Sequence, residues 1–113
     1  MAVEKSLATG SMALLLLSLL SQKEMYGYEM IESLRKQSNN VFELKAGTLY
    51  PLLHGLEEKQ LLTSCEKEVG GKVRKYYAIT KEGRKELKKK REAWQEYAGA
   101  VSSVIGGAVY GSI

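Results

Sequence analysis

The sequence predicts an α+β fold that is mainly helical, with three helices and a β-hairpin in residues 1–80 and one long helix in residues 81–113. Apolar residues recur at helical spacing in the first half of the chain. Two β-compatible runs flank Gly70 and Gly71, and a long charged segment follows. A chain of 113 residues is large enough for a single domain with a modest core.

The first helix is expected at about residues 3 to 21. The run "SMALLLLSLL" resembles the apolar centre of a secretory signal. It has only about half of the roughly 20 residues that cross a bilayer, and no small-residue cleavage site follows it. We therefore expect a buried helix that packs with the last helix, and no membrane insertion. The single Cys65 excludes an internal disulfide and fits a reducing compartment, so the sequence predicts a cytoplasmic protein.

The second helix is expected in "YGYEMIESLRKQ", residues 26–37. Tyr28, Ile31 and Leu34 recur there at helical spacing, with Met30 beside them. The "SNN" at 38–40 should end this helix, because asparagine and serine favour turns. A short extended piece, "VFEL", is expected before the third helix.

The third helix is expected in "AGTLYPLLHGLEEKQLL", residues 46–62, and its two faces differ sharply. One face should pack on the core and carries Leu49, Leu52, Leu53 and Leu56. The opposite face has no long charged side chain for two turns and carries Gly47, Pro51, His54 and Glu58, with Thr48 and Gly55 to one side and Tyr50 to the other. Pro51 is tolerable if the helix starts near Lys45 to Gly47, because the first turns have unpaired N–H groups.

A β-hairpin and a long helix complete the predicted fold. "LLTSCEKEV" and "VRKYYAI" flank "GGK", and tight hairpin turns need glycine because they require positive φ. Tyr76 and Tyr77 alternate between the two faces of their strand, so we expect one of them to lie in the core. Thr80 is a candidate N-cap for the long helix, with Glu82 in the first turn.

This order of elements is that of the winged helix-turn-helix, in which the third helix enters the DNA major groove. A face that enters a groove about 12 Å wide needs small and short polar residues, which explains why the face opposite the leucines has no long charged side chain for two turns. The wing cations can reach the flanking phosphates. The candidate DNA-binding residues are Lys45, Gly47, Thr48, Tyr50, Pro51, His54, Lys72, Arg74 and Lys75.

The charge of the chain supports a polyanionic partner. The net charge is +4, but residues 67–92 alone hold 11 Lys or Arg and 4 Glu. Such a local basic block is typical of nucleic-acid binding. The alternative interpretation is an ordinary solvated helix face rich in lysine. A second alternative is a winged-helix protein-interaction module without DNA binding.

Enzymatic function finds little support. His54 and Cys65 are the only residues of their types, they fall in separate elements, and neither has an acidic partner at a suitable spacing. The sequence has no phosphate-binding loop and no dinucleotide fingerprint. We expect no cofactor and no metal.

The last helix predicts a homodimer. Its apolar residues follow a heptad-like spacing, which a domain of this size cannot cover alone. They are Leu87, Trp94, Tyr97, Val101, Val104 and Ala108. The uncharged end, "YAGAVSSVIGGAVYGSI", contains four glycines, of which Gly106 and Gly107 weaken a helix. A membrane anchor is the alternative interpretation of this segment, although its length and glycines argue against one.

Several blocks of the sequence resemble the PadR family of bacterial transcription regulators. They are "YGYEMIESLRK", "KAGTLYPLLHGLEEKQLL", "GGKVRKYYAITKEGRKEL" and Trp94, in order from about residue 7 to about residue 97. The resemblance implies a winged-helix dimer that represses promoters by binding an inverted repeat in double-stranded DNA. It also implies the short form, with a single C-terminal dimerisation helix. Family members often carry a basic residue where this chain has Gly55, which puts one phosphate contact in question.

Trp94 has two interpretations. It can be an aromatic anchor that fills the dimer interface, which is the one we favour. The resemblance offers another, because a multidrug-sensing family member pairs a tryptophan at the matching place across the dimer axis and stacks planar cations between the two rings. Trp94 is therefore a candidate binding residue for a planar or amphiphilic small-molecule effector, with Glu92 or Glu96 able to balance a cationic one.

Overall fold

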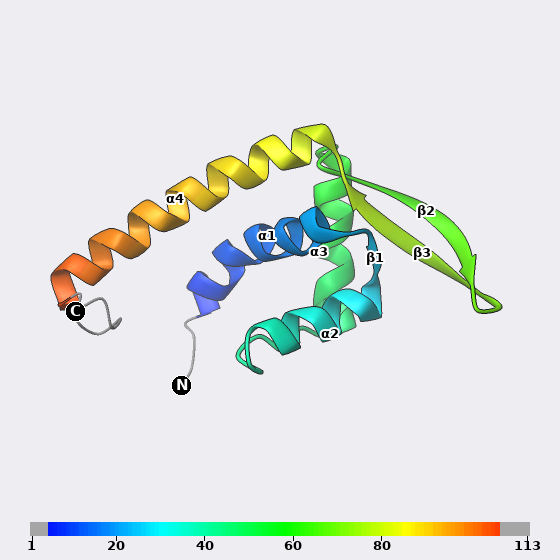
Figure 1. Ribbon diagram of the computed structural model, residues 1–113, viewed down its shortest axis with the longest axis horizontal. Coiled ribbons are helices and arrows are strands. Elements are labelled where there is room, and N and C mark those ends of the chain that lie inside the picture. Colours follow the sequence, from blue (N-terminus) through cyan, green and yellow to red (C-terminus); the bar gives the residue numbers. More distant parts are fainter. Residues whose placement is uncertain (1–4, 107–113) are drawn as a thin grey trace.

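The computed structural model describes residues 5–106, with side chains from residue 12 onward. The elements are α1 (Lys5–Gln22), β1 (Met25–Tyr26), α2 (Gly27–Gln37), α3 (Ala46–Glu58), β2 (Leu62–Val69), β3 (Lys72–Ile79) and α4 (Lys81–Ile105). Figure 1 shows α1, α2 and α3 gathered together, with the β2–β3 hairpin projecting to one side and α4 to the other. The molecule is therefore elongated, with extents of 52 × 28 × 23 Å. The predicted winged helix-turn-helix with a long C-terminal helix is confirmed.

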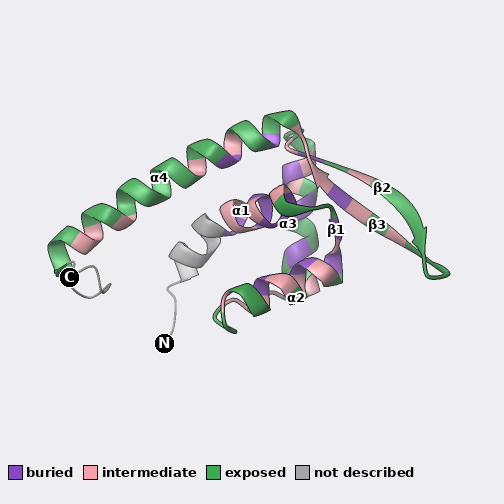
Figure 2. Ribbon diagram, in the orientation of Figure 1, coloured by how far each residue is buried: buried purple, intermediate pink, exposed green. Residues whose placement is uncertain are grey.

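The core lies between α1, α2, α3 and the base of the sheet (Figure 2). Leu16 and Leu17 of α1 have no exposed surface, and neither have Leu49 and Leu53 of α3. Leu56 is also buried, as its spacing predicts, whereas Leu52 is half-buried at the edge of the core. The buried first helix is thus confirmed where the structure describes it. None of the helices in residues 5–106 is long and apolar enough to span a membrane.

The second helix differs from the sequence prediction in two ways. Its buried face consists of Gly27, Met30 and Leu34, so the placement of Tyr28 on the apolar face was wrong: Tyr28 is 69% exposed. Tyr26 belongs to β1, a two-residue strand that the sequence did not predict. A strand this short has no periodicity, and it forms because β3 offers a free edge.

The ends of α2 and α3 have the same geometry. Asn39 has φ +53°, and the N–H of Asn40 donates to the carbonyl of Arg35 at 2.8 Å. After α3, Gln60 has φ +64°, and the N–H of Leu61 donates to the carbonyl of Leu56 at 3.0 Å. Both are Schellman caps, which require a left-handed residue after the helix. The "SNN" ends α2 as predicted, because asparagine tolerates this conformation.

The sheet has the order β1-β3-β2 and is antiparallel throughout. The predicted hairpin is confirmed: Val69 pairs with Lys72, and Gly70 and Gly71 between them have φ +62° and +80°. Two consecutive positive φ values define the tight turn whose twist matches that of the strands. Tyr77 is the buried tyrosine of the pair, with 1% of its surface exposed.

The start of α4 is fixed to the rest of the domain. The Thr80 hydroxyl oxygen accepts from the N–H of Gly83 at 2.9 Å, which confirms Thr80 as the N-cap. A Cβ on Gly83 would overlap the carbonyl of Leu61, so glycine permits the close approach of α4 to the segment between α3 and β2. Leu87 is 5% exposed and belongs to the core, which corrects its assignment to the dimer seam.

Beyond Leu87, α4 leaves the domain and is largely exposed (Figure 2). The helix ends at Ile105, and Gly106 follows with φ +92°, in agreement with the expected weakness at this glycine pair. The predicted seam residue Ala108, and Gly107 and Gly111 of the tail, lie outside the described residues, as does the expected start of the first helix at residue 3.

Candidate nucleic-acid interface

The outward face of α3 carries short side chains, as the sequence predicts. Gly47, Thr48, Pro51 and His54 are all exposed. A Cβ on Gly47 or on Gly55 would meet no atom within 4 Å, so both glycines border open space. Pro51 has no N–H, so the carbonyl of Gly47 one turn earlier lacks its usual helical partner. This face can therefore approach another surface closely and still offer hydroxyl, imidazole and carbonyl groups.

Tyr50 lies at the edge of this face and also contributes to the packing of α2 on α3. The residue is 36% exposed. Its phenol occupies the space beside Gly27, the first residue of α2, where a Cβ would overlap the hydroxyl. Tyr50 is thus positioned by the α2–α3 contact, a role that its place on a helical wheel does not reveal. Its hydroxyl lies next to the N-terminus of α2.

The wing carries the predicted cations in the expected positions. Lys72 and Lys75 are exposed, Arg74 is half-buried, and Lys45 lies at the N-cap of α3. In the part of the chain described with side chains, none of these four cations forms an ion pair; the five ion pairs found there involve other residues. Their positive charge is therefore available to an external anion.

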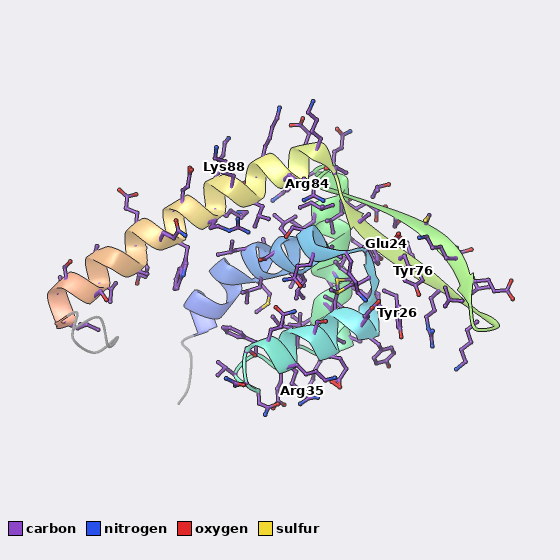
Figure 3. The ribbon with its side chains drawn as sticks, in the orientation of Figure 1. Glu24, Tyr26, Arg35, Tyr76, Arg84 and Lys88 are labelled. Atoms are coloured by element: carbon purple, nitrogen blue, oxygen red, sulfur yellow. The ribbon has the colours of Figure 1, made fainter. Side chains whose placement is uncertain are left out.

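An aromatic and charged cluster covers the outer face of the sheet at the base of the wing, and the sequence did not reveal it (Figure 3). The Tyr26 and Tyr76 rings meet edge to face with centroids 5.4 Å apart. The Arg74 guanidinium lies 4.4 Å from the Tyr26 centroid, and the Lys67 ammonium lies 5.4 Å from the Tyr76 centroid. Lys67 also pairs with Glu24 at 2.6 Å, a hydrogen-bonded contact that raises the pKa of the lysine.

On the inner face, Tyr77 is buried, and among the side chains that the structure describes its hydroxyl finds no hydrogen-bond partner. The Lys75 ammonium lies over its ring, 5.6 Å from the centroid. Burial raises the pKa of Tyr77, and the nearby Lys75 charge partly opposes that rise. Next to it, the Ser64 hydroxyl donates to the Glu57 carboxylate at 2.7 Å, which ties α3 to the wing strand β2.

The basic half of α4 is mostly unpaired. Lys85 and Lys90 contact Glu82 and Glu86 at 3.7 and 3.6 Å, within the helix. Arg84, Lys88 and Arg91 are exposed. These side chains place positive charge along the first half of α4, where Figure 3 labels Arg84 and Lys88, consistent with the charge segregation in the sequence.

The far half of α4 exposes the predicted apolar seam. Trp94, Tyr97 and Val104 are 45%, 51% and 86% exposed, and Val101 is half-buried. The Trp94 and Tyr97 rings lie 5.8 Å apart with an interplanar angle of 34°. Large apolar side chains in such a row are typical of a surface that binds a partner.

Among the described residues no group of His, Cys, Asp or Glu side chains could hold a metal ion, and Cys65 is exposed on β2.

Comparisons with known proteins agree with this architecture. Residues 16–89 match the model of the transcriptional regulator PadR-like family. The chain is 36% identical over 87 residues to a transcriptional regulator of Mycobacterium tuberculosis, covering 77% of this chain and 76% of that protein. It is 35% identical over 83 residues to the transcriptional regulator YqjI of Escherichia coli, covering 74% of this chain but 39% of the relative.

Solved structures with the same fold include a PadR family transcriptional regulator from Eggerthella lenta. It is 34% identical with a TM-score of 0.77, and the match covers 89% of this chain and 87% of that one. A transcriptional regulator from Clostridium thermocellum is 31% identical with a TM-score of 0.81, over 88% of this chain and 97% of that one. The similarity therefore includes the winged-helix elements and much of the last helix.

Proposed function

Because the chain belongs to the PadR-like family of transcriptional regulators, we propose that it is a repressor that binds an inverted-repeat operator in double-stranded DNA as a homodimer. The observation that carries this proposal is the pairing of two surfaces. The outward face of α3 has no long charged side chain over its first two turns, and the wing beside it holds cations without ion-pair partners among the residues with described side chains. The first suits a major groove and the second suits the flanking phosphates.

The residues divide into two roles. We assign Thr48 and His54 to base edges or nearby phosphates, because they are exposed on the groove-facing side of α3. Lys45, Lys72, Arg74 and Lys75 are assigned to phosphates, which fix the register but carry no sequence information. Gly47, Pro51 and Tyr50 shape the face and allow close approach. Gly55 borders open space, so the face keeps room at the position where family members often carry a basic residue.

The dimer is assigned to α4. Its exposed aromatic and aliphatic residues beyond Leu87 form one row, and a second copy of the same row would cover them. A dimer also suits an inverted repeat, because a two-fold protein places two recognition helices in symmetric half-sites. Trp94, Tyr97, Val101 and Val104 are the proposed contacts. Leu87 no longer belongs to this set.

Release from DNA by a small-molecule effector would involve the same exposed row of α4. Trp94 and Tyr97 present neighbouring rings that could accept a planar or amphiphilic guest at the dimer axis. A planar cationic dye that quenches Trp94 fluorescence saturably, and weakens DNA binding by the same coupling, would support an effector site. Direct packing of the two Trp94 rings predicts unchanged fluorescence and a weaker dimer for Trp94→Ala.

Footprinting on the DNA upstream of the chain's own gene tests the proposal. We expect a protected inverted repeat, whose protection is lost with Thr48→Ala and His54→Ala in a protein that remains folded and dimeric. Lys72→Ala should weaken binding to all sequences alike, because it removes a phosphate contact. Absence of any protected site, together with normal folding, would favour a protein-interaction module instead.

A further inference from the structure

We propose that Tyr26 is a positioning residue of the DNA-binding surface: its ring holds the Arg74 guanidinium at the base of the wing, ready for a DNA phosphate. The inference rests on the proposed DNA-binding function and adds to it a residue that lies outside both α3 and the wing. Tyr26 is the N-cap of α2 and the last residue of β1. Its distance to the guanidinium, 4.4 Å from ring centroid to Cζ, is that of a close cation–π contact.

The strand register explains why Arg74 needs such a partner. Lys67 of β2 and Arg74 of β3 are directly opposite in the ladder, and like charges in that position repel. The two side chains separate. Lys67 crosses the Tyr76 ring to reach Glu24, whereas Arg74 lies against Tyr26. The edge contact between Tyr26 and Tyr76 fixes the two rings relative to each other.

The two cations are not equivalent after this separation. Lys67 has an anionic partner at 2.6 Å. Arg74 has none among the side chains described in residues 12–106, and the tyrosine face offers no formal charge to neutralise it. Its full positive charge is therefore held in one place and remains available to an external anion. Figure 3 places Tyr26 between the start of α2 and the wing, on the side toward which the wing projects.

Holding the guanidinium before binding matters because an arginine side chain is flexible. A free arginine loses rotamer freedom when a phosphate immobilises it, and that loss weakens binding. Stacking on an aromatic ring removes much of the freedom in advance and leaves the N–H groups at the edge of the guanidinium free to donate. A lysine at position 74 would keep the charge but lose the planar guanidinium that contacts the Tyr26 ring.

Fluorescence anisotropy of labelled duplex DNA tests this role, with one duplex taken from upstream of the chain's own gene and one unrelated duplex. Tyr26→Phe keeps the ring and should bind almost as the wild type does. Tyr26→Leu should weaken binding to both duplexes about three- to tenfold, the range expected for a lost cation–π contact of moderate strength. In an Arg74→Gln background, Tyr26→Leu should have no further effect, because its partner is already absent.

Glu24→Gln is the matched control, since it breaks the Lys67 ion pair in the same cluster but leaves the Arg74 stack. We expect it to bind as tightly as the wild type or more tightly, because it removes a negative charge. If Tyr26→Leu lowers DNA affinity equally in the wild-type and the Arg74→Gln background, the cluster merely supports the wing and the inference is overturned. The same holds if Glu24→Gln lowers DNA affinity as much as Tyr26→Leu does.

Arg74→Lys provides a second variant should Tyr26→Leu fail to fold. It keeps the charge and the fold, so full affinity in this variant would overturn the inference, and a loss similar to that of Arg74→Gln would support it. A wild-type protein that binds neither duplex would overturn the proposed function and this inference together. If the wild type binds DNA with a steep salt dependence but the effects of Tyr26→Leu and Arg74→Gln on the binding free energy add, the inference alone would be overturned.

Discussion

The Tyr50 hydroxyl in α3 occupies the space that a Cβ on Gly27, the first residue of α2, would need. This relationship joins two neighbouring helices at the edge of the candidate DNA-binding face. Glycine at 27 is required by the neighbouring ring and not by its own backbone, because its φ is not among the positive values of the chain. The contact fixes where the Tyr50 phenol points.

We predict that Gly27→Ala displaces the Tyr50 ring and weakens DNA binding more than it lowers the free energy of unfolding. The ring is 36% exposed and can rotate outward, so the overlap is relieved without unpacking the core. Anisotropy and chemical denaturation of the same protein measure the two effects. In a Tyr50→Ala background, Gly27→Ala should change neither DNA affinity nor the free energy of unfolding, because the ring that it would displace is absent. A large loss of stability from Gly27→Ala in that background would contradict this explanation.

Gln60 offers a way to stabilise the domain. The residue has φ +64° in the cap after α3, a conformation that costs a non-glycine residue energy. Gln60→Gly should therefore raise the free energy of unfolding by up to about 1 kcal/mol, less the greater entropy of glycine in the unfolded chain. Denaturant midpoints measure the change. Asn39→Gly is the comparison, and its gain should be smaller because asparagine already tolerates this region.

Substitutions of Leu87 and Val104 distinguish a core residue of α4 from a residue of the proposed dimer interface. Leu87 is 5% exposed within one chain, whereas Val104 is 86% exposed. Leu87→Ala should cost about 2–5 kcal/mol of stability at any protein concentration. Val104→Ser should leave the fold intact and shift the monomer–dimer equilibrium in sedimentation experiments. A dimer that survives Val104→Ser combined with Tyr97→Ser would place the interface elsewhere.

Tyr77 predicts a loss of stability at alkaline pH. Burial raises its pKa above the ordinary value of 10.0, so the folded state keeps the proton when the unfolded chain has lost it. The stability present below pH 10.0 must therefore fall as the pH rises toward the folded pKa. Tyr77→Phe should flatten this decline, and it should cost little stability at neutral pH because the buried hydroxyl has no hydrogen-bond partner within the described part of the chain. Thermal melts across this range test both statements.

Sequence reasoning succeeded where a pattern has a local cause. The glycine pair at 70 and 71 requires a tight turn, Thr80 caps the helix that follows, and the leucines of α3 mark its core face. Each of these depends on residues close together in the chain. The short-side-chain face of α3 was visible for the same reason, since a helical wheel needs only the spacing of residues.

The errors and omissions involve contacts between distant residues. Leu87 fits a heptad, but α4 packs against α1, and this residue is buried in the core. Tyr28 has the helical spacing of a core residue, but the buried face of α2 includes Gly27 and not Tyr28. The cluster of Tyr26, Tyr76, Arg74, Lys67 and Glu24 joins three segments through the strand register, which no spacing along the chain encodes.

We propose that this chain binds the DNA backbone through Lys45 at the N-cap of α3 and through the cations of the wing, and the salt dependence of binding tests this proposal most directly. Affinity for duplex DNA should fall linearly with salt on a log–log plot, with a slope of about −0.9 for each phosphate contacted. Replacing Lys72 and Lys75 with glutamine should reduce the magnitude of the slope by nearly two such steps, on operator and unrelated DNA alike. An affinity that does not change with salt, or a slope that the double variant leaves unchanged, would contradict the account.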